Sequence, residues 1–568
     1  MVSGERALAT SLSKLDDVAL TATLAARNVS TGVAWRDFFD AAAALLDQSS
    51  IDRALARLPR SALIALTAPD ASATAVSSRL ALLDENGRPF DAVSTRIAAL
   101  RAERPAAFEP AAPLPPRPSG GEAAAAERAF TSAGALADVL LACVHSPLSR
   151  TGAGAVSAAD RRRLVDVGAV SSAEELDDLI AAAASARLAL PSGREWHVTH
   201  TGEEWLEAAT LDRWRAIVAG FLRVVPDGLR SSGGGIVDRD LWAGAYPLDA
   251  EWPERVARIE RTAVRWGLLG IDGIEPSWTA GIRQGSEIDV STLAEHLPAE
   301  IDRVYLQADL TAIAPGPLAP ALELRLRAIA VRESRAQAST YRFTAESLAA
   351  GLTEGETAES MRAFLSGLSL TGIPQPLEYL IESTAARHGL VRVRTDEASD
   401  RTRVLGADPG ILDAIAVDQA LRPLGLVRDG HELVSRVARD AVYWSLADAR
   451  YPVVAIDASG APESLHRRTG RFAAEEEKTP REAYAGLVAT LRASLGTDGD
   501  AAWLDRELDQ AVRGRAVIVV VVRLPGGDER SFTLEASGLG GGRLRGRDRA
   551  ADIERTLPVS SIVSVRPA

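Results

Sequence analysis

Two sets of arginines have a spacing that suits phosphate binding. The first has helical spacing in "EWPERVARIERTAVRW" and comprises Arg255, Arg258, Arg261 and Arg265. The second alternates along "GRLRGRDR" and comprises Arg543, Arg545, Arg547 and Arg549. Because helix side chains repeat every 3.6 residues and strand side chains every two, each set is expected to share one face. Guanidinium groups on a common face suit phosphate oxygens.

Each set also has a purely structural interpretation. The helical set is interrupted by Glu254 and Glu260, which is typical of a solvated helix face, and the alternating set is typical of an exposed strand edge protected by charge. The formal net charge of −13 limits any nucleic-acid contact to local basic surfaces.

An earlier helix that begins near Ser171 has the opposite character. Its first turns carry Glu174, Glu175, Asp177 and Asp178. Acidic side chains at a helix start complement the helix dipole, and they repel DNA. We expect this helix to have a structural role.

The sequence offers no site for ATP chemistry. A phosphate-binding loop needs a lysine after a glycine-rich turn, and the two lysines, Lys14 and Lys478, lie in "SLSKLDD" and "EEEKTPRE". The cluster "GLGGGRLRG" lacks the third glycine of a dinucleotide-binding turn. We therefore expect no cofactor, no helicase activity of its own and no catalytic residue.

Metal and thiol chemistry are not expected either. His197 and His200, with Glu203 nearby, would point to opposite faces if the segment is extended. The single cysteine, Cys143, lies in the apolar helical stretch "LLACVHS" and suits a buried position. We predict no metal site.

Composition sets the limits within which these residues must be positioned. A chain of 568 residues with 46% hydrophobic and 25% charged residues is expected to fold into about three to five domains. One cysteine, no signal-peptide pattern and no apolar run of about 18 residues favour a cytoplasmic protein with no membrane contact.

Breaks in composition predict a multi-domain α+β protein. We expect a helical or winged-helix N-terminal half, a central α/β domain and a small C-terminal β-barrel. A Pro-rich linker is expected because residues 104–128 contain six prolines. The predicted boundaries are 1–103 (helical, with a possible winged helix), 104–128 (linker), 129–222 and 250–298 (both winged-helix-like), 299–460 (central domain) and 481–568 (β-rich).

Three stretches share a pattern of helix, strand, turn and strand. They are "SSRLALLDENGRPF" (residues 77–90), "SARLALPSGREWHVTHTGEEWL" (185–206) and "VRWGLLGIDGIEPSWTAGI" (264–282). This order is that of a winged helix, and it also fits generic helical domains that carry a hairpin.

The central domain opens on an alternating stretch, "VYLQADLTAIAPGPL". Period-2 alternation predicts one strand with Tyr305, Gln307, Asp309 and Thr311 on its less buried face. Thr344 and Thr357 are expected N-caps, Pro376 is expected at the first position of a helix, and Gly389 is its expected left-handed stop.

This stretch, followed by "STYRFTAESLAAGLTEGETAESMRAFLSGLSLTGIPQPLEYLIESTAARHG", resembles the helicase-associated domain in the N-terminal part of XPB-type DNA-repair helicases. It is also similar to stand-alone bacterial proteins that carry this domain without a motor. The resemblance implies a DNA-handling role and supplies no catalytic residue. The residues that carry it are Gln307, Asp309, Thr311, Tyr341, Arg342, Pro374, Gln375 and Pro376.

The tail from residue 513 is similar in pattern to WYL domains, although the Trp-Tyr-Leu signature is absent. Two functional hypotheses result. The first is a non-catalytic DNA-binding, helicase-associated accessory protein that works with an XPB-type helicase in DNA repair or handling. The alternative is a winged-helix transcriptional regulator with a WYL-like sensing domain.

Overall fold

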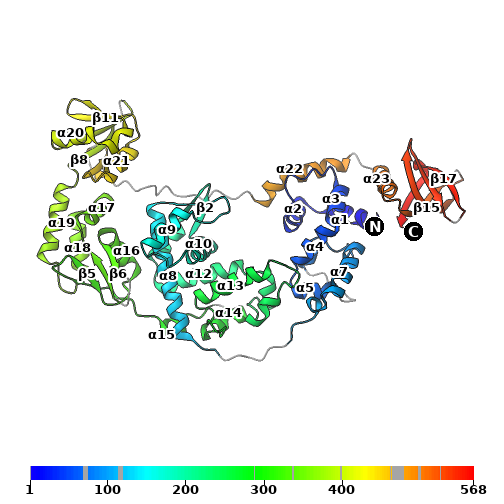
Figure 1. Cartoon of the computed structure of the whole chain (residues 1–568), viewed down its shortest axis with the longest axis horizontal. Helices are drawn as coiled ribbons and strands as arrows, with labels where there is room; N and C mark the ends of the chain where they lie inside the picture. Colours follow the sequence, from blue (N-terminus) through cyan, green and yellow to red (C-terminus); the bar gives the residue numbers. More distant parts are fainter. Residues whose placement is uncertain are drawn as a thin grey trace.

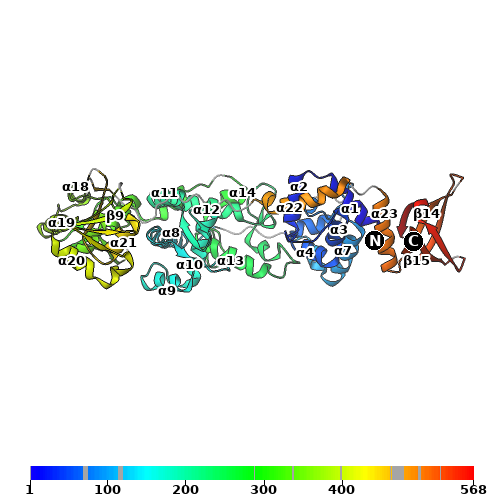
Figure 2. The ribbon, with the colours of Figure 1, turned by 90° about the horizontal axis from the view of Figure 1, so that it is seen from above.

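The structure is a computed structural model that describes residues 2–67, 75–112, 119–286, 288–334, 338–396, 399–458, 460, 462–463, 479–496, 500–524, 526–549 and 551–567. Within these residues, the buried apolar side chains form five separate hydrophobic clusters. Figures 1 and 2 show the C-terminal sheet, the N-terminal helical unit and the central helical unit following one another along the longest axis, with the two remaining units next to each other at the far end. The chain is thus a mixed α and β protein with several sheets.

The N-terminal unit is helical. Asp16, Asp37 and Asp47 each precede a helix and accept a hydrogen bond from an amide of its first turn, which satisfies a donor that the helix leaves free. The helices are α1 (Val2–Lys14), α2 (Asp17–Ala26), α3 (Phe38–Leu46), α4 (Gln48–Ala56), α5 (Arg60–Thr67), α6 (Ala75–Arg79) and α7 (Asp91–Glu103).

The predicted linker is structured at both of its ends. The short helix η1 (Pro105–Phe108) buries Phe108 in the N-terminal cluster, and α8 already begins at Glu122. Its proline-dense middle, residues 113–118, lies outside the described residues.

Helix α22 (Pro480–Ala493) packs on this N-terminal unit, although the sequence placed it with the C-terminal strands. The Tyr484 hydroxyl donates to the Val29 carbonyl over 2.6 Å, and the Arg492 guanidinium donates to the Ser13 carbonyl over 2.7 Å. Leu487 and Leu491 enter the same hydrophobic cluster. The apolar face of an amphipathic helix does not specify which core it joins, so the boundary at 481 could not be drawn from sequence.

The central helical unit spans the two regions predicted as separate winged-helix-like domains, and both share one hydrophobic cluster. Buried tryptophans join the two regions, and the Trp214 indole donates to the Trp266 carbonyl over 2.8 Å. The elements are α8 (Glu122–His145), β1 (Leu148–Ser149), α9 (Ala158–Asp166), α10 (Ala173–Ser185), β2 (Ala189–Ser192), β3 (Glu195–Val198), α11 (His200–Glu207), α12 (Thr210–Val224), η2 (Asp227–Leu229), η3 (Arg239–Gly244), α13 (Trp252–Arg265), η4 (Ser277–Thr279), α14 (Ala280–Gln284) and α15 (Ser291–His296).

The three predicted hairpins differ in the structure. The middle one forms: β2 and β3 pair antiparallel after α10, and β1 adds to β3. The first is reduced to a single bridge between Leu83 and Pro89, and the third is a turn in which the Gly270 amide donates to the Ile274 carbonyl over 2.7 Å. In the third, η4 and α14 follow directly instead of a second strand.

The next unit combines an antiparallel sheet with helices. The sheet order is β4-β5-β7-β6, and its strands all pair antiparallel, whereas an α/β domain implies parallel strands. Parallel pairing in this unit is limited, among the described residues, to the single bridges Ile301–Leu318 and Val304–Ser369. The predicted N-caps Thr344 and Thr357 are both present, each in a capping box. The elements are β4 (Tyr305–Leu306), β5 (Thr311–Ala314), α16 (Pro320–Ile329), β6 (Val331–Ser334), β7 (Ser339–Arg342), α17 (Ala345–Thr353), α18 (Ala358–Leu368) and α19 (Gln375–Arg387).

The prediction of one strand across residues 304–312 is wrong. The chain turns between β4 and β5, where the Gln307 amide donates to the Thr311 carbonyl over 2.9 Å and Leu310 adopts a left-handed φ of 66°. The Thr311 hydroxyl donates to the Asp309 carboxylate over 2.6 Å, and the Thr311 side chain is buried. The Asp and Thr side chains stabilise this turn by hydrogen bonds to nearby backbone and side-chain groups. The alternation of apolar and polar residues does not show such bonds, so it did not reveal the turn.

A second sheet follows within the range predicted as one central domain. Its order is β10-β11-β9-β8-β12-β13, and its buried face packs against α20 and α21 in a cluster separate from that of the preceding unit. The β8–β12 pair is parallel. The elements are β8 (Val391–Asp396), β9 (Arg401–Gly406), α20 (Pro409–Val417), η5 (Gln419–Leu424), β10 (Val427–Asp429), β11 (Glu432–Ser435), α21 (Arg439–Asp448), β12 (Val453–Ile456) and β13 (Pro462–Glu463).

The C-terminal unit is an open sheet, and the prediction of a β-barrel is wrong. The strand order is β17-β16-β15-β14-β18, with β17 and β18 at opposite edges. Helix α23 (Asp500–Arg513) covers one face, where Leu508 meets Val520 and Leu534 in one cluster. Because a helix buries this apolar face, the sheet need not close on itself. The strands are β14 (Val517–Arg523), β15 (Glu529–Gly540), β16 (Arg543–Asp548), β17 (Ile553–Pro558) and β18 (Ile562–Pro567).

Candidate nucleic-acid interface

The arginines predicted on one helix face all lie on α13, but acidic side chains neutralise most of them. Arg255 pairs with Asp249 at 2.8 Å, and Arg258 is exposed. Arg261 and Arg265 point instead toward the acidic helix α10.

The contact between α13 and α10 is a network of ion pairs. The Arg265 guanidinium lies 3.1 Å from the Glu175 carboxylate and 3.2 Å from that of Asp178. Arg261 lies 3.4 Å from Glu174 and 3.7 Å from Asp178, whose side chain is 6% exposed. The acidic helix α10, which was expected to repel DNA, therefore forms ion pairs with α13, the helix expected to attract DNA. Guanidinium groups engaged in this way are not available to phosphates.

The alternating arginines of β16 retain their exposed face. Arg543, Arg545 and Arg547 are exposed, whereas the residues between them are buried. Arg547 pairs with Asp552 at 2.6 Å, and Arg549 pairs with Glu535 at 3.0 Å. The guanidinium groups of Arg543 and Arg545 make no hydrogen bond or ion pair within the described part of the chain.

The residues opposite them on the neighbouring strands explain why these two guanidinium groups have no ion-pair partner among the described residues. Arg543 lies opposite Gly540 and Pro558, and Arg545 lies opposite Gly538 and Thr556. Residues directly opposite one another share a face, and these neighbours carry small side chains or none. The two arginines are therefore the strongest candidates for phosphate contact.

The motif residues that carried the family resemblance have structural roles. Tyr341 is buried, and burial together with the nearby Glu323 carboxylate raises its pKa. Arg342 pairs with Glu333 across the sheet.

The Pro-Gln-Pro segment begins α19. Pro374 is the N-cap, Gln375 is the first helical residue and Pro376 is the second, one position later than predicted. Gly389 has the expected left-handed φ of 80°. These residues shape turns and helix starts, and they do not form a common site with the arginines of β16.

A buried charge cluster between units escaped the sequence analysis. Asp138 on α8 is 3% exposed and accepts hydrogen bonds from Arg327 and Arg332, each over 2.5 Å. Arg332 also donates to Glu323 over 2.9 Å. Burial pulls the pKa of Arg332 down, but the two carboxylates outweigh it and leave that pKa raised. The partners lie almost 200 residues apart in sequence, so no local pattern indicated the cluster.

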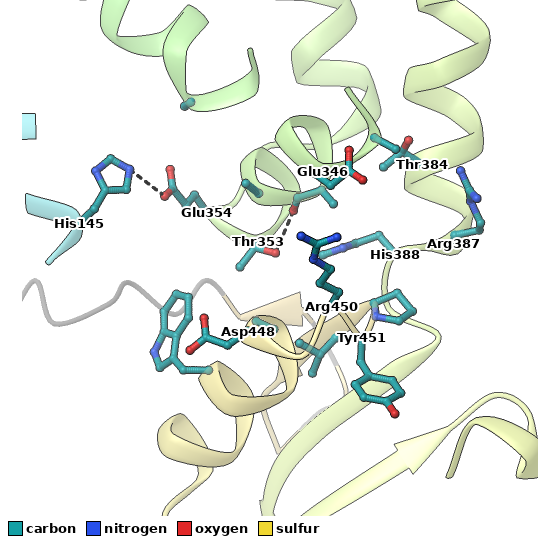
Figure 3. A pocket seen from close by; sticks show the side chains of 18 of the residues that line it. His145, Glu346, Thr353, Glu354, Thr384, Arg387, His388, Asp448, Arg450 and Tyr451 are labelled. Carbon is teal, nitrogen blue, oxygen red and sulfur yellow. Dashed lines mark hydrogen bonds and ion pairs between the residues drawn. The ribbon is translucent and has the colours of Figure 1, made fainter. Parts of the chain in front are cut away.

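The same junction contains a cavity of about 770 Å³. Its walls come from the end of α8, from α16, α17 and α19, and from α21 with the segment that follows it. Figure 3 shows this cavity and its polar side chains.

The histidine candidates lie beside carboxylates, and the cysteine candidate is buried. His197 on β3 pairs with Glu195, and His200 opens α11 beside Glu203 and Glu204. Burial raises the pKa of Cys143 to about 11, which keeps the thiol protonated at neutral pH. No group of three or more His, Cys, Asp or Glu side chains in the described ranges is placed to hold a metal ion.

A family model described as "Helicase conserved C-terminal domain" matches residues 304–429. The match covers less than a quarter of the chain and runs from β4 to β10. The prediction of a helicase-associated domain is confirmed at this level, although the description concerns a C-terminal rather than an N-terminal helicase region. A search of curated proteins finds no match. Among the described residues, no helix is both long and apolar enough to cross a bilayer.

Proposed function

We propose that this chain is a non-catalytic, helicase-associated accessory protein that binds DNA and works with an XPB-type helicase in DNA repair or handling. The observation that carries the proposal is the match of residues 304–429 to a helicase family in a chain whose two lysines lack a glycine-rich phosphate-binding loop. Such a chain would contribute binding surfaces, and a separate motor would supply ATP hydrolysis.

The DNA contact is assigned to the outer face of β16. Arg543 and Arg545 are the members of the two predicted arginine sets that are both exposed and unpaired and that lie side by side on one sheet face. Each phosphate neutralised by such a group releases counterions, so affinity should fall steeply with salt.

Salt-dependent binding tests this assignment on duplex, forked and single-stranded DNA. The Arg543→Gln/Arg545→Gln variant should weaken binding and lower the slope of log K against log salt by about 2, since each phosphate that is no longer neutralised lowers it by roughly one unit. A matched control with the same charge change, Arg513→Gln/Arg530→Gln, alters α23 and the opposite face of the sheet. Equal slopes for the two double variants would refute the assignment.

The partnership is tested separately with the full chain and the host's XPB-type helicase. We expect co-purification and a changed ATPase or unwinding rate. The absence of both effects would refute the partnership, whatever the DNA-binding result.

A second candidate, a winged-helix transcriptional regulator, is favoured by one observation. The order helix, strand, helix, helix and hairpin, from α8 to β3, is that of a winged helix. The helix in the position of a DNA reader would be α10, whose acidic side chains contact α13. Genome-wide occupancy focused on a few promoters would support this candidate, and scattered or damage-dependent occupancy would oppose it.

A further inference from the structure

The cavity at the junction has the size and lining of a ligand site. Its volume of about 770 Å³ lies within the range of small-molecule pockets. Its walls are mainly apolar, with Leu141 and Val144 from α8, Leu324 from α16, Leu390 after α19 and Trp444 from α21. An apolar lining with a few polar groups is the usual composition of such sites.

Two of the lining residues each carry a buried polar atom without a partner among the described residues. The Thr384 hydroxyl belongs to a side chain that is 5% exposed, and its oxygen has no hydrogen-bond partner among the described residues. The Nε2 atom of His388, one turn further along the chain, is also buried without a partner. Burial lowers the pKa of this imidazole, so it is neutral at pH 7. An unpaired buried polar group is costly, and a ligand that bonds to it removes that cost.

Two arginines, Arg387 and Arg450, line the same cavity. Arg450 has a left-handed φ of 63°, and its guanidinium makes no hydrogen bond or ion pair with the described residues, although its charge lowers the pKa of Glu346. The Nε of Arg387 donates to the Ser383 carbonyl, and the other guanidinium nitrogens make no hydrogen bond or ion pair with the described residues.

Most acidic side chains of the lining lie on the side of the cavity opposite Thr384 and His388. On that side, Glu354 lies 3.8 Å from His145. Glu346 is the exception: hydrogen bonds from its own amide and from Thr344 lower the pKa of its carboxyl group, which holds the charge at the start of α17. Figure 3 shows one side of the cavity formed by Thr384, Arg387, His388 and Arg450, and the other by His145, Glu354 and Asp448.

We propose that this junction cavity binds a small organic anion, with a carboxylate or phosphate ester held by Arg387, Arg450, Thr384 and His388 and a flat apolar body against Trp444. The inference goes beyond the proposed function and does not depend on it, because no DNA or helicase takes part. A ligand there would touch three units of the chain at once.

Binding of 1-naphthyl phosphate to the full chain, measured by calorimetry, tests the proposal. We expect saturable binding at one site, weaker binding of the neutral 1-naphthol, and weaker binding of inorganic phosphate. Comparison with 1-naphthoate distinguishes the two head groups, since the tighter ligand identifies the preferred anion. Affinity for 1-naphthol equal to that for both anionic compounds, or no saturable binding of either anion, would overturn the proposal.

Three substitutions assign the binding to this cavity. Arg450→Gln should weaken 1-naphthyl phosphate binding by about tenfold to a hundredfold, because a charge-assisted hydrogen bond is removed. Thr384→Val should weaken it by about threefold to tenfold without lowering the melting temperature of the free protein, because the hydroxyl has no partner there. Glu346→Gln should tighten it by about twofold to fivefold.

The matched control is Arg436→Gln, which removes an exposed arginine of the same unit outside the cavity. Its affinity should equal that of the unmodified chain. Equal weakening by Arg436→Gln and Arg450→Gln would show non-specific charge binding and would overturn the assignment.

Discussion

Replacing Asp138 with Asn removes one negative charge from the junction between α8 and the unit that comprises β4 to α19, while it preserves the shape of the side chain. Asp138 is 3% exposed, and it accepts hydrogen bonds from Arg327 and Arg332. The substitution leaves two guanidinium groups facing a neutral amide. We expect the contact between α8 and α16 to open more often, while each unit keeps its own core.

The magnitude follows from the burial of the partners. Removing one member of a buried ion pair costs about 3–5 kcal/mol. The Arg327 and Arg332 side chains are 21% and 15% exposed, and Arg332 keeps its bond to Glu323, so the lower end of that range applies. A cost of about 3 kcal/mol corresponds to roughly 150-fold more frequent opening.

Hydrogen exchange resolved by peptide is the suitable assay, because a chain of several units has no single free energy of unfolding. Amides of α8 and α16 that exchange through opening of this contact should exchange about 150-fold faster, while those of the C-terminal sheet should not change. The control is Asp212→Asn, whose partner Arg215 lies 2.6 Å away on the exposed surface of α12 and whose effect should stay within a few fold. An increase in α8 and α16 no larger than that of the control would refute the reasoning.

Two further predictions concern other contacts. Burial raises the pKa of Glu507, which lies in the contact between α23 and α1; the charge of Arg6 opposes this shift, and the charge of Glu5 adds to it. The stability that Glu507 contributes is therefore fully present below the ordinary pKa of 4.5 and is lost as the pH rises through the raised pKa. Glu507→Gln should therefore raise the melting temperature at pH 7.5 and lose this advantage near pH 4.5; an equal gain at both pH values would contradict the assignment. Gly202→Ala would place a Cβ 2.1 Å from the Leu188 carbonyl and should destabilise the central helical unit by about 1–3 kcal/mol, measured by hydrogen exchange of that unit. The Cβ of Gly486→Ala in α22 would meet nothing within 4 Å, and by the same measurement this substitution should stabilise the N-terminal unit by up to about 1 kcal/mol. Equal effects of the two glycine substitutions would contradict the packing.

Local signals predicted local features well. Thr344 and Thr357 cap helices as expected, because capping depends on residues within one turn of each other. The exposed face of β16 followed from strict alternation. The turn at Leu310 was missed because alternation continues through a short hairpin and does not distinguish it from one strand.

The sequence by itself determined the capped helix starts at Thr344 and Thr357, the outward face of β16, the likeness of residues 304–429 to a helicase domain, and the lack of a glycine-rich loop before either lysine. These properties depend on neighbours within a few residues or on residue identity alone. Tertiary structure alone decided that α10 neutralises α13, that α22 joins the N-terminal core, and that Asp138 meets Arg327 and Arg332. A charged side chain or an apolar helix face can pair with any complementary surface. The fold, and not the spacing along the chain, therefore decides which surface it contacts.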